Sequence, residues 1–380
     1  MRSPFPALIL AASALLAGGC SWLNPFSTSV PKPAELVALQ PTAELTTLWQ
    51  ARIGSSGDYV FQPAVVGDDI YAAAHDGAVA RYRAGKAVWT ANTGKRLSAG
   101  VGSDGRVTVV VTTDGEVVAF DAESGAERWR SFIGAEVLVA PAVGESLVVV
   151  RASDSRLIGF DANDGARRWV FQRAVPPLAL RTSAGVTIEG GAAVAGYPGG
   201  KLVAVSLANG GQIWELTVAS PRGSTELERV ADVVGTPVFG RREICAVSYQ
   251  GRAACFDFTN GNAIWARDFS SSVGMARDTR FVYITDDKDA VHGLDAFSGA
   301  DVWKQDALRR RAVSRPVVAG DFVAVGDLEG YVHLLRRETG VFAARARADS
   351  SAIVADPQTF GPQGFVVQTR DGGLYVFEAR

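Results

Sequence analysis

The chain has 380 residues, 47% of them hydrophobic, which is enough for a large buried core or for two domains. Its 38 basic and 40 acidic residues nearly balance, so no overall positive field would draw it to nucleic acid or to an anionic membrane surface. Glycine is frequent, with 41 residues, which suits a chain with many tight turns.

Residues 1–19 have the pattern of a secretory signal peptide, with one early arginine and an apolar run too short to span a bilayer. The run ends in LLAGGC, which resembles the lipobox of bacterial lipoproteins, although Ala17 rather than a leucine stands three positions before Cys20. Acylation of Cys20 is therefore expected; a secretory signal with a chance cysteine is the alternative. Under the lipoprotein reading, Ser21 implies the outer membrane. Residues 20–43, rich in proline, are expected to form a flexible tether.

An internal repeat runs through the rest of the chain and is marked by tryptophan. Seven of the eight tryptophans follow short β-like segments and a glycine turn, and Phe342 is expected to take the next position. Alternating apolar residues, as in VVAFDA, and turns such as Asp114-Gly115 predict β-hairpins with two-residue turns. The seven residues are Trp49, Trp89, Trp129, Trp169, Trp214, Trp265 and Trp303.

Each repeat of roughly 40 residues predicts a four-stranded antiparallel meander, which cannot bury both of its faces alone. Radial repetition into a β-propeller solves this, whereas a linear solenoid would need polar caps at both ends. Eight three-strand bodies begin near residues 60, 98, 138, 181, 233, 272, 313 and 351. The last body lacks a tryptophan strand, and the first tryptophan strand lacks a body. The sequence therefore predicts an all-β, eight-bladed propeller over residues 44–380, closed by the N-terminal strand.

The tryptophans are expected to be structural, packing on the adjacent blade and donating the indole N–H to its backbone. Two further cysteines, Cys245 and Cys255, flank a turn expected at Gln250-Gly251. A two-residue turn would pair residue 246, rather than Cys245, with Cys255, so a disulfide needs a bulge or a longer turn. The oxidising compartment implied by the signal peptide permits one.

Motifs for catalysis are missing from the sequence. The three histidines lie far apart, no metal-ligand spacing occurs, and there is no nucleophile elbow, phosphate loop or CxxC pair. The sequence therefore predicts a protein that is not an enzyme and that needs no metal or cofactor.

The repeats resemble the tryptophan-docked repeats of pyrroloquinoline-quinone dehydrogenases, which typically have a longer chain and an adjacent cysteine pair. The whole chain more closely resembles the BamB family, propeller lipoproteins of the outer-membrane β-barrel assembly machinery. The lipobox, the closure by the N-terminal strand, and the segments PPLALR (176–181) and GSTELERVADVVGTPV (223–238) carry this resemblance. The family often has a second acid two positions after Asp232, where this chain has Val234, so a role that needs both acids is not implied.

The longest connections between blades are expected on one face of the disc, where binding loops usually lie. The resemblance implies that residues of two such connections contact a partner. For the first connection, ordinary core packing of the leucines is the alternative; for the second, a solvated turn. The basic run 309–311 either meets an acidic partner or is solvated. The expected partner-binding residues are Leu178, Leu180, Arg181, Glu226, Arg229 and Asp232.

The resemblance implies a non-enzymatic scaffold at the outer membrane that docks the periplasmic domains of the barrel-assembly protein, BamA. Nascent outer-membrane proteins are a further expected partner, and pairing of sheet edges is one conceivable mode of binding. The alternatives are a small periplasmic quinoprotein enzyme and a propeller that binds polysaccharide or peptidoglycan.

Overall fold

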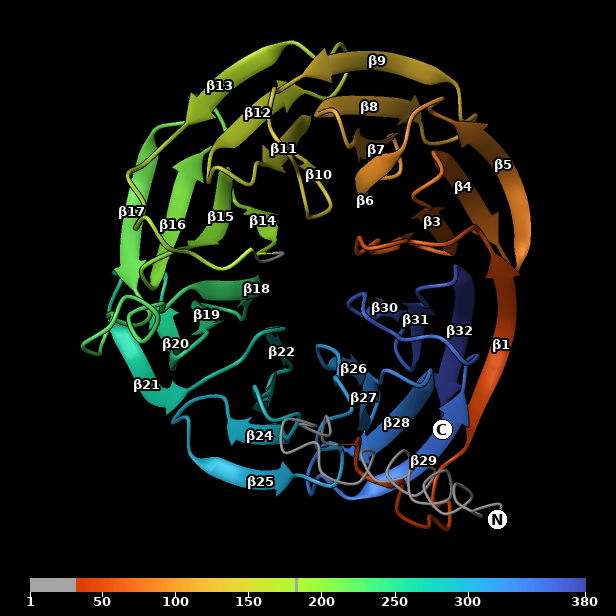
Figure 1. The fold of residues 1–380 in the computed structure, drawn as a ribbon, viewed down its shortest axis with the longest axis vertical. Coiled ribbons are helices and arrows are strands. Elements are labelled where there is room, and N and C mark those ends of the chain that lie inside the picture. Colours follow the sequence, from red (N-terminus) through yellow and green to blue (C-terminus); the bar gives the residue numbers. More distant parts are fainter. Residues whose placement is uncertain (1–31, 182–183) are drawn as a thin grey trace, which may run out of the picture. The chain divides into compact units, whose positions relative to one another are not determined.

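The structure is a computed structural model that describes residues 32–181 and 184–380. The expected signal peptide and Cys20 lie outside the described residues. The compact body, Ala34–Arg380, contains eight four-stranded antiparallel sheets arranged around a central axis (Figure 1). The predicted eight-bladed propeller is thereby confirmed. In the described part of the chain, no helix is long and apolar enough to cross a membrane.

Each blade runs from an inner strand to an outer strand in chain order. Blade 1 comprises β2 (Ala64–Val66), β3 (Asp69–Ala73), β4 (Ala78–Arg83) and β5 (Lys86–Asn92). Blade 2 comprises β6 (Leu97–Ser103), β7 (Val107–Thr112), β8 (Glu116–Asp121) and β9 (Glu127–Phe132). Blade 3 comprises β10 (Ala142–Gly144), β11 (Leu147–Arg151), β12 (Leu157–Asp161) and β13 (Arg167–Phe171). Blade 4 comprises β14 (Val186–Glu189), β15 (Ala192–Tyr197), β16 (Lys201–Ser206) and β17 (Gln212–Thr217).

The second half of the ring follows the same order. Blade 5 comprises β18 (Val233–Phe239), β19 (Glu243–Ser248), β20 (Gly251–Asp257) and β21 (Ala263–Phe269). Blade 6 comprises β22 (Met275–Arg277), β23 (Phe281–Thr285), β24 (Val291–Asp295) and β25 (Asp301–Gln305). Blade 7 comprises β26 (Val317–Ala319), β27 (Phe322–Gly326), β28 (Tyr331–Arg336) and β29 (Phe342–Arg347). Blade 8 comprises β30 (Gln358–Phe360), β31 (Gly364–Gln368), β32 (Gly373–Ala379) and, from the other end of the chain, β1 (Leu45–Arg52).

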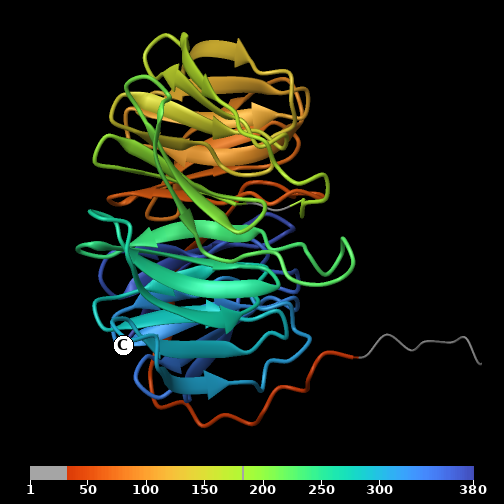
Figure 2. The same ribbon diagram turned by 90° about the vertical axis from the view of Figure 1, so that its left-hand side faces the viewer.

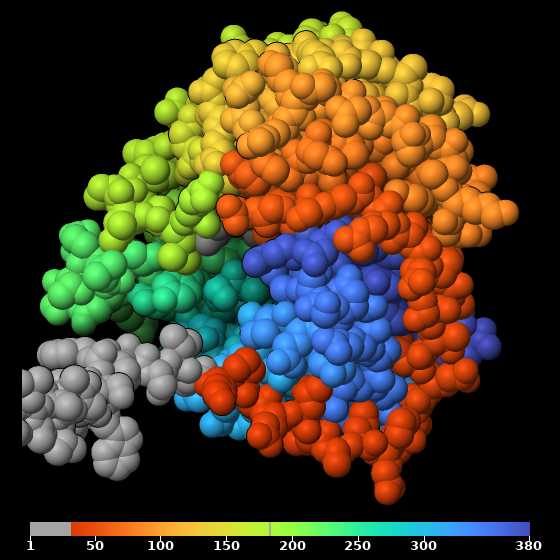
Figure 3. Space-filling view, turned by 45° about the vertical axis from the view of Figure 1, so that its right-hand side comes forward, coloured from red at the N-terminus to blue at the C-terminus, as the bar shows by residue number. Residues whose placement is uncertain are grey.

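The N-terminal strand closes the ring as predicted. Strand β1 pairs antiparallel with β32, from Leu45 opposite Ala379 to Arg52 opposite Gly373. In the space-filling view, the N-terminal segment lies as a band against the C-terminal blade (Figure 3). The seam therefore has the same backbone ladder as any other blade, and it leaves no unpaired edge between the first and last blades.

Residues 34–43, expected as part of a flexible tether, instead lie with Glu44 along blades 7 and 8. The backbone N–H of Ala34 donates to the Arg309 carbonyl at 3.0 Å, and that of Thr42 donates to the Ala343 carbonyl at 2.8 Å. Leu39 packs against the hydrophobic cluster that joins blades 6 and 7. The compact body thus begins about ten residues earlier than the expected boundary at residue 44, because main-chain hydrogen bonds and apolar contacts fix this segment. We call residues 34–44 the strap.

The turns between the second and third strands of each blade have three residues, so the predicted two-residue turns were wrong. In blade 1, for example, Ala73 pairs with Val79, and the N–H of Ala74 bonds to the Ala78 carbonyl around the loop 75–77. The last loop residue, Gly77, has a φ of 100°. Glycine in third position of a three-residue loop is a common hairpin solution, and it is what the Asp-Gly pairs of this sequence specify.

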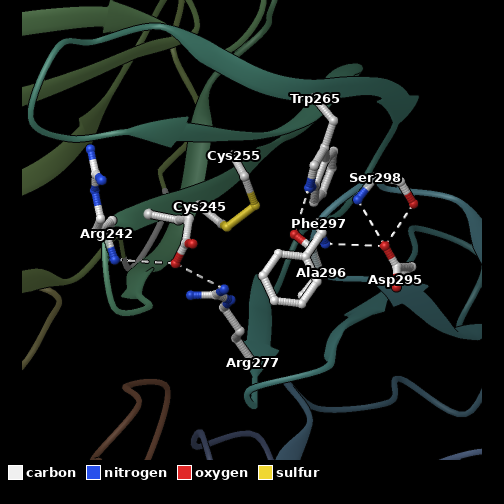
Figure 4. Close-up of a disulfide and its surroundings, with 10 residues drawn as sticks. Arg242, Cys245, Cys255, Trp265, Arg277, Asp295, Ala296, Phe297 and Ser298 are labelled. Atoms are coloured by element: carbon white, nitrogen blue, oxygen red, sulfur yellow. Dashed lines mark hydrogen bonds and ion pairs between the residues drawn. A yellow bond between two sulfur atoms is a disulfide. The ribbon is translucent and has the colours of Figure 1, made fainter.

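The longer turn also settles the register of the two cysteines. Cys245 on β19 lies directly opposite Cys255 on β20, with their Cα atoms 4.1 Å apart, and the two form a disulfide (Figure 4). Both residues are fully buried in the cluster that joins blades 5 and 6. The disulfide that the sequence left open therefore bridges neighbouring strands within blade 5.

Five tryptophans join their blade to the next one by the same contact. The indole N–H donates to a backbone carbonyl of the following blade, as Trp129 does to Ala162 at 3.0 Å. The ring lies on a glycine of the turn between that blade's third and fourth strands, where a Cβ on Gly165 would come within 2.6 Å of the indole of Trp129. We call this contact the tryptophan staple. Its donors and acceptors are Trp89 and Ala122, Trp129 and Ala162, Trp169 and Leu207, Trp265 and Ala296, and Trp303 and Arg337.

Three blade boundaries lack the staple. In blade 7, Ala344 pairs with Leu334 as Trp303 pairs with Gly293, so Ala344 and not Phe342 occupies the tryptophan position; the expectation for Phe342 was wrong. Blade 8 has no covalent turn between its third and fourth strands to receive an indole, because β1 comes from the other chain end, and the strap packs there instead.

The other two exceptions are Trp49 and Trp214, whose indoles make no hydrogen bond within the described residues. Trp49, on the closing strand, still packs its Cβ on the turn glycine Gly85 of blade 1. Trp214 is only partly buried, and the turn glycine that would receive it, Gly261, instead lies beside Leu216. The boundary between blades 4 and 5 therefore departs from the staple without the constraint of ring closure.

Candidate docking surface

The connections between blades share one face of the disc with the turns between second and third strands, as the meander predicts. Within the described residues, this turn bonds to the connection that leads into the same blade in seven of the eight blades, blade 4 being the exception. The N–H of Ser153 donates to the Glu136 carbonyl, and that of Tyr249 to the Asp232 carbonyl, each at 2.8 Å. The side view shows the long connections around blades 4 and 5 projecting from this side (Figure 2). We call this side the loop face.

Asp232 holds the two long connections of the loop face together. Its side chain is buried, with 2% of the residue exposed, and both carboxylate oxygens accept backbone hydrogen bonds. One accepts from the N–H of Leu180 at 2.6 Å and the other from that of Gly199 at 3.2 Å. The acid predicted to contact a partner thus fixes the backbone of the PPLALR segment, and its oxygens are already engaged.

The two leucines of that segment do not point the same way. Leu180 is partly buried and packs on the cluster that contains Val234 and the disulfide. Leu178 is 39% exposed. Core packing, the alternative considered for both leucines, applies to Leu180, whereas Leu178 offers its side chain to solvent.

Arg181 crosses to the neighbouring connection. Its guanidinium pairs with the carboxylate of Glu136 at 2.5 Å, and its side chain remains 67% exposed. An ion pair this exposed contributes little to stability, so a competing carboxylate can replace Glu136 at small cost.

The connection after blade 4 forms a single helical turn at residues 225–229. In this turn, charged residues stand on both sides of one leucine in the sequence. Glu228 caps the turn: its carboxylate accepts the N–H of Ser224 at 2.8 Å and that of Thr225 at 3.1 Å. Hydrogen bonding by Thr225 and Ser224 holds the pKa of Glu228 below its usual range. Glu226 and Arg229 are exposed, and Leu227 between them is 72% exposed. Sequence reasoning missed Leu227, although an isolated leucine within ELER was a visible signal.

A hollow of about 320 Å³ lies beside these groups. Leu180, Arg181 and Asp232 line it, so three predicted residues share one concave site. Its remaining wall mixes apolar and polar groups, and it includes one residue that sequence reasoning missed, Arg151. Other lining residues are Leu138, Val139, Ser153, Asp154, Val175, Pro176, Pro177 and Val233.

The run 309–311 is not one basic patch. Arg309 pairs with Asp306 at 2.5 Å on the surface. Arg311 is buried, pairs with Asp327 at 2.7 Å and with Glu329, and donates to the carbonyl of Ala34 in the strap. Arg311 therefore fastens the strap and is not available to a partner. Among the described residues, no group of three or more histidine, cysteine or acidic side chains is placed to hold a metal.

Known proteins match this chain along nearly its whole length. The model of the family described as outer membrane protein assembly factor BamB matches residues 75–305 and 287–380. The outer membrane protein assembly factor BamB of Bordetella pertussis is 44% identical, with all of both chains covered, and that of Pseudomonas aeruginosa is 39% identical, with 94% of each covered. The chain belongs to the BamB family.

Solved structures agree with this assignment. The crystal structure of BamB from Moraxella catarrhalis superposes with a TM-score of 0.82 at 27% identity, covering 88% of this chain and all of that one. The quinohemoprotein alcohol dehydrogenase of Comamonas testosteroni has a TM-score of 0.67 at 14% identity and covers 88% of this chain. The likeness to the dehydrogenase shows the propeller fold alone, and the BamB relatives are named as assembly factors and not as enzymes.

Proposed function

We propose that this chain is a non-enzymatic scaffold of the outer-membrane β-barrel assembly machinery that docks the periplasmic domains of a BamA-type protein. In this role it helps outer-membrane proteins, including nascent chains, to fold and insert. One observation carries the proposal: the two long connections of the loop face, 172–181 and 223–232, are tied together at Asp232. They expose Leu178 and Leu227, and Arg181 lines a hollow between them and the neighbouring connection.

This arrangement suits a protein partner. Here exposed leucines lie near an arginine whose ion pair is weak. Small clusters of this kind contribute most of the binding free energy in many protein interfaces. The blades beneath are rigid, because main-chain ladders and buried clusters fix them. The exposed side chains therefore lose little freedom when a partner binds.

Titration calorimetry of the mature protein in detergent against the periplasmic domains of the BamA-type protein tests the docking step. Leu178→Ala and Arg181→Ala are each expected to weaken binding by about tenfold or more, as interface anchors do. Unfolding curves check that each variant keeps its fold. Saturable binding by the wild type, lost in these variants, supports both the function and the site.

Matched controls on other surfaces sharpen the result. Ile213 on β17 is 53% exposed on the outer rim, and Arg168 on β13 is an exposed, ion-paired arginine beside the opposite-face turn of blade 3. Ile213→Ala and Arg168→Ala should bind as the wild type does. Equal losses in control and test variants would remove the assignment to the loop face, and the absence of wild-type binding would refute the docking function.

We propose a lipid anchor at Cys20 and a place at the periplasmic side of the outer membrane. The strap supports this, because Arg309 and Arg311 hold its first residue, Ala34, at the loop face. Ala34, the first residue of the compact body, thus lies on the docking side. Cys20→Ala should move the protein from the outer-membrane fraction to the soluble periplasmic fraction. Retention in the membrane fraction, in a strain lacking the partner, would contradict the anchor.

A further inference from the structure

Arg151 is a positive charge that lines the hollow and, within the described residues, makes no direct ion pair. It ends strand β11, and its guanidinium donates to the carbonyl of Gly196 and lies 4.7 Å from the ring centre of Tyr197. No carboxylate of the described residues forms an ion pair with it. Burial lowers the pKa of the Arg151 guanidinium, which indicates that water solvates the charge poorly.

Every acid near this guanidinium is already engaged by another group. Asp154 pairs with Arg156 at 2.7 Å, and Asp232 accepts two backbone N–H groups. Glu136 pairs with Arg181. The charge of Asp232 acts in the opposite direction and raises the pKa of Arg151, but no carboxylate contacts the guanidinium directly. A poorly solvated cation without a directly bound counter-ion is destabilising, and a ligand that supplies one can bind there.

The walls of the hollow restrict what that ligand is. Val139, Val175, Pro176 and Leu180 make much of the lining apolar, and the lining carboxylates of Asp154 and Asp232 would repel a multiply charged group. A single carboxylate on an otherwise apolar stretch of protein fits both conditions. The guanidinium can bind such a group with two parallel hydrogen bonds.

We propose that the hollow of the loop face receives a carboxylate side chain of the docked protein partner, and that Arg151 is its receptor. This inference rests on the proposed docking function and adds the chemistry of recognition. The partner's acid would replace lost solvation of Arg151, while apolar neighbours of that acid cover Leu180 and the two prolines. Arg151 thus sets which segment of the partner enters the hollow.

Arg151→Met tests the proposal, because methionine keeps the volume of the stem and removes the charge. Removing an unpaired, desolvated cation should leave the unfolding midpoint unchanged or raised. Binding to the partner's periplasmic domains should weaken by at least about thirtyfold, as for other buried charge pairs across interfaces. Arg151→Lys should bind with intermediate affinity, since it restores the charge without the planar fork.

Arg173→Met is the matched control. Arg173 lies 5.4 Å from the same Tyr197 ring, but it pairs with Glu215 and does not line the hollow. The Arg173→Met variant should bind the partner's periplasmic domains with the affinity of the wild type. Wild-type affinity in Arg151→Met, or an unfolding midpoint lower than that of Arg173→Met, would overturn the inference and leave the docking function standing. Failure of the wild type to bind the partner would instead refute the docking function itself.

Inorganic phosphate distinguishes a free anion from a protein carboxylate. At equal ionic strength, phosphate and chloride should give the wild type the same unfolding midpoint. Stabilisation by phosphate that disappears in Arg151→Met, with partner binding unchanged, would mean that the site takes a free oxyanion, and it would overturn the proposal.

Discussion

The boundary between blades 2 and 3 and the boundary between blades 4 and 5 solve the same packing problem differently. At the first, the indole of Trp129 lies on Gly165 and bonds to Ala162. At the second, Trp214 is partly exposed and Leu216 takes the place over the glycine. The second boundary is also the one that carries the 223–232 connection of the loop face. The staple is absent at the boundary that carries the 223–232 connection, but it is present between blades 3 and 4, where Trp169 bonds to Leu207 and where the 172–181 connection lies.

Removing the tryptophans should give the largest contrast. Trp129→Ala should lower the free energy of unfolding by about 3–5 kcal/mol, because it leaves a cavity and an unpaired carbonyl between blades. Trp214→Ala should cost at least about 1 kcal/mol less, since no staple hydrogen bond is lost. Urea unfolding of both variants measures the difference. Equal losses would mean that the staple hydrogen bond contributes nothing to the boundary.

The disulfide stabilises blade 5 from within, on the side that packs against blade 6. Cys245 and Cys255 belong to the cluster against which Leu180 packs. Their replacement by alanine should cost about 2–3 kcal/mol, the value expected for a short closed loop. Urea unfolding with and without reductant checks this, and the double variant must then be insensitive to reductant. Equal stability of wild type and variant under oxidising conditions would assign the disulfide no structural role.

A comparison of two turn glycines can separate the effect of a steric clash with the neighbouring side chain from the effect of backbone strain. Gly165 and Gly261 both have φ values in the left-handed region, 71° and 75°. A Cβ at Gly165 would come within 2.6 Å of the Trp129 ring, whereas at Gly261 the nearest atom is the Leu216 side chain at 3.2 Å.

Gly165→Ala and Gly261→Ala should therefore share a strain of about 1 kcal/mol, and Gly165→Ala should lose about 1–3 kcal/mol more from overpacking. Thermal and urea unfolding measure the two losses. The same loss in both would show that the indole of Trp129 moves freely aside and that the staple is loose.

A buried histidine of blade 7, on the side that packs against blade 6, should show the smallest effect and a pH dependence. Buried His333 donates from Nε2 to Asp327 at 2.9 Å, and its Nδ1 accepts from Arg345 at 3.1 Å, so the imidazole is neutral. Burial lowers the pKa of His333. As the pH falls, the imidazole of the unfolded chain is therefore protonated at a higher pH than that of the folded protein. The free energy of unfolding thus decreases as the pH drops below about 6.5.

His333→Gln can keep both hydrogen bonds without titrating. Between pH 7.5 and 5.5 the wild type should lose about 1 kcal/mol more than this variant in urea unfolding. Parallel pH profiles would contradict the neutral, buried imidazole.

The regular repeat made the fold predictable from the sequence. Parts of the site were not predictable, because they lie in the long connections between blades, which do not follow the repeat. Tryptophan spacing and the unmatched first and last strands were enough to predict eight blades and their closure. The cysteine register was not accessible, because Gln250-Gly251 alone does not distinguish two-residue from three-residue turns. Asp232 was identified as a site residue, but its engagement by two backbone N–H groups depends on how distant loops meet. Arg151 could not be found, since only the fold removes acidic partners from its surroundings.

Closure through β1 also constrains the order in which the molecule forms. Blades 1 to 7 each consist of consecutive strands, so each can form from a continuous stretch of chain. The eighth pairs Leu45 with Ala379. The entropy cost of bringing such distant segments together is compensated only when β1 and β32 pair, after the other blades have formed. An incomplete chain would keep an unpaired β1 and an open ring. Because β1 pairs with β32, the ring can close only when the whole chain is present. A truncated chain would keep an open ring and is expected to be more susceptible to proteolysis.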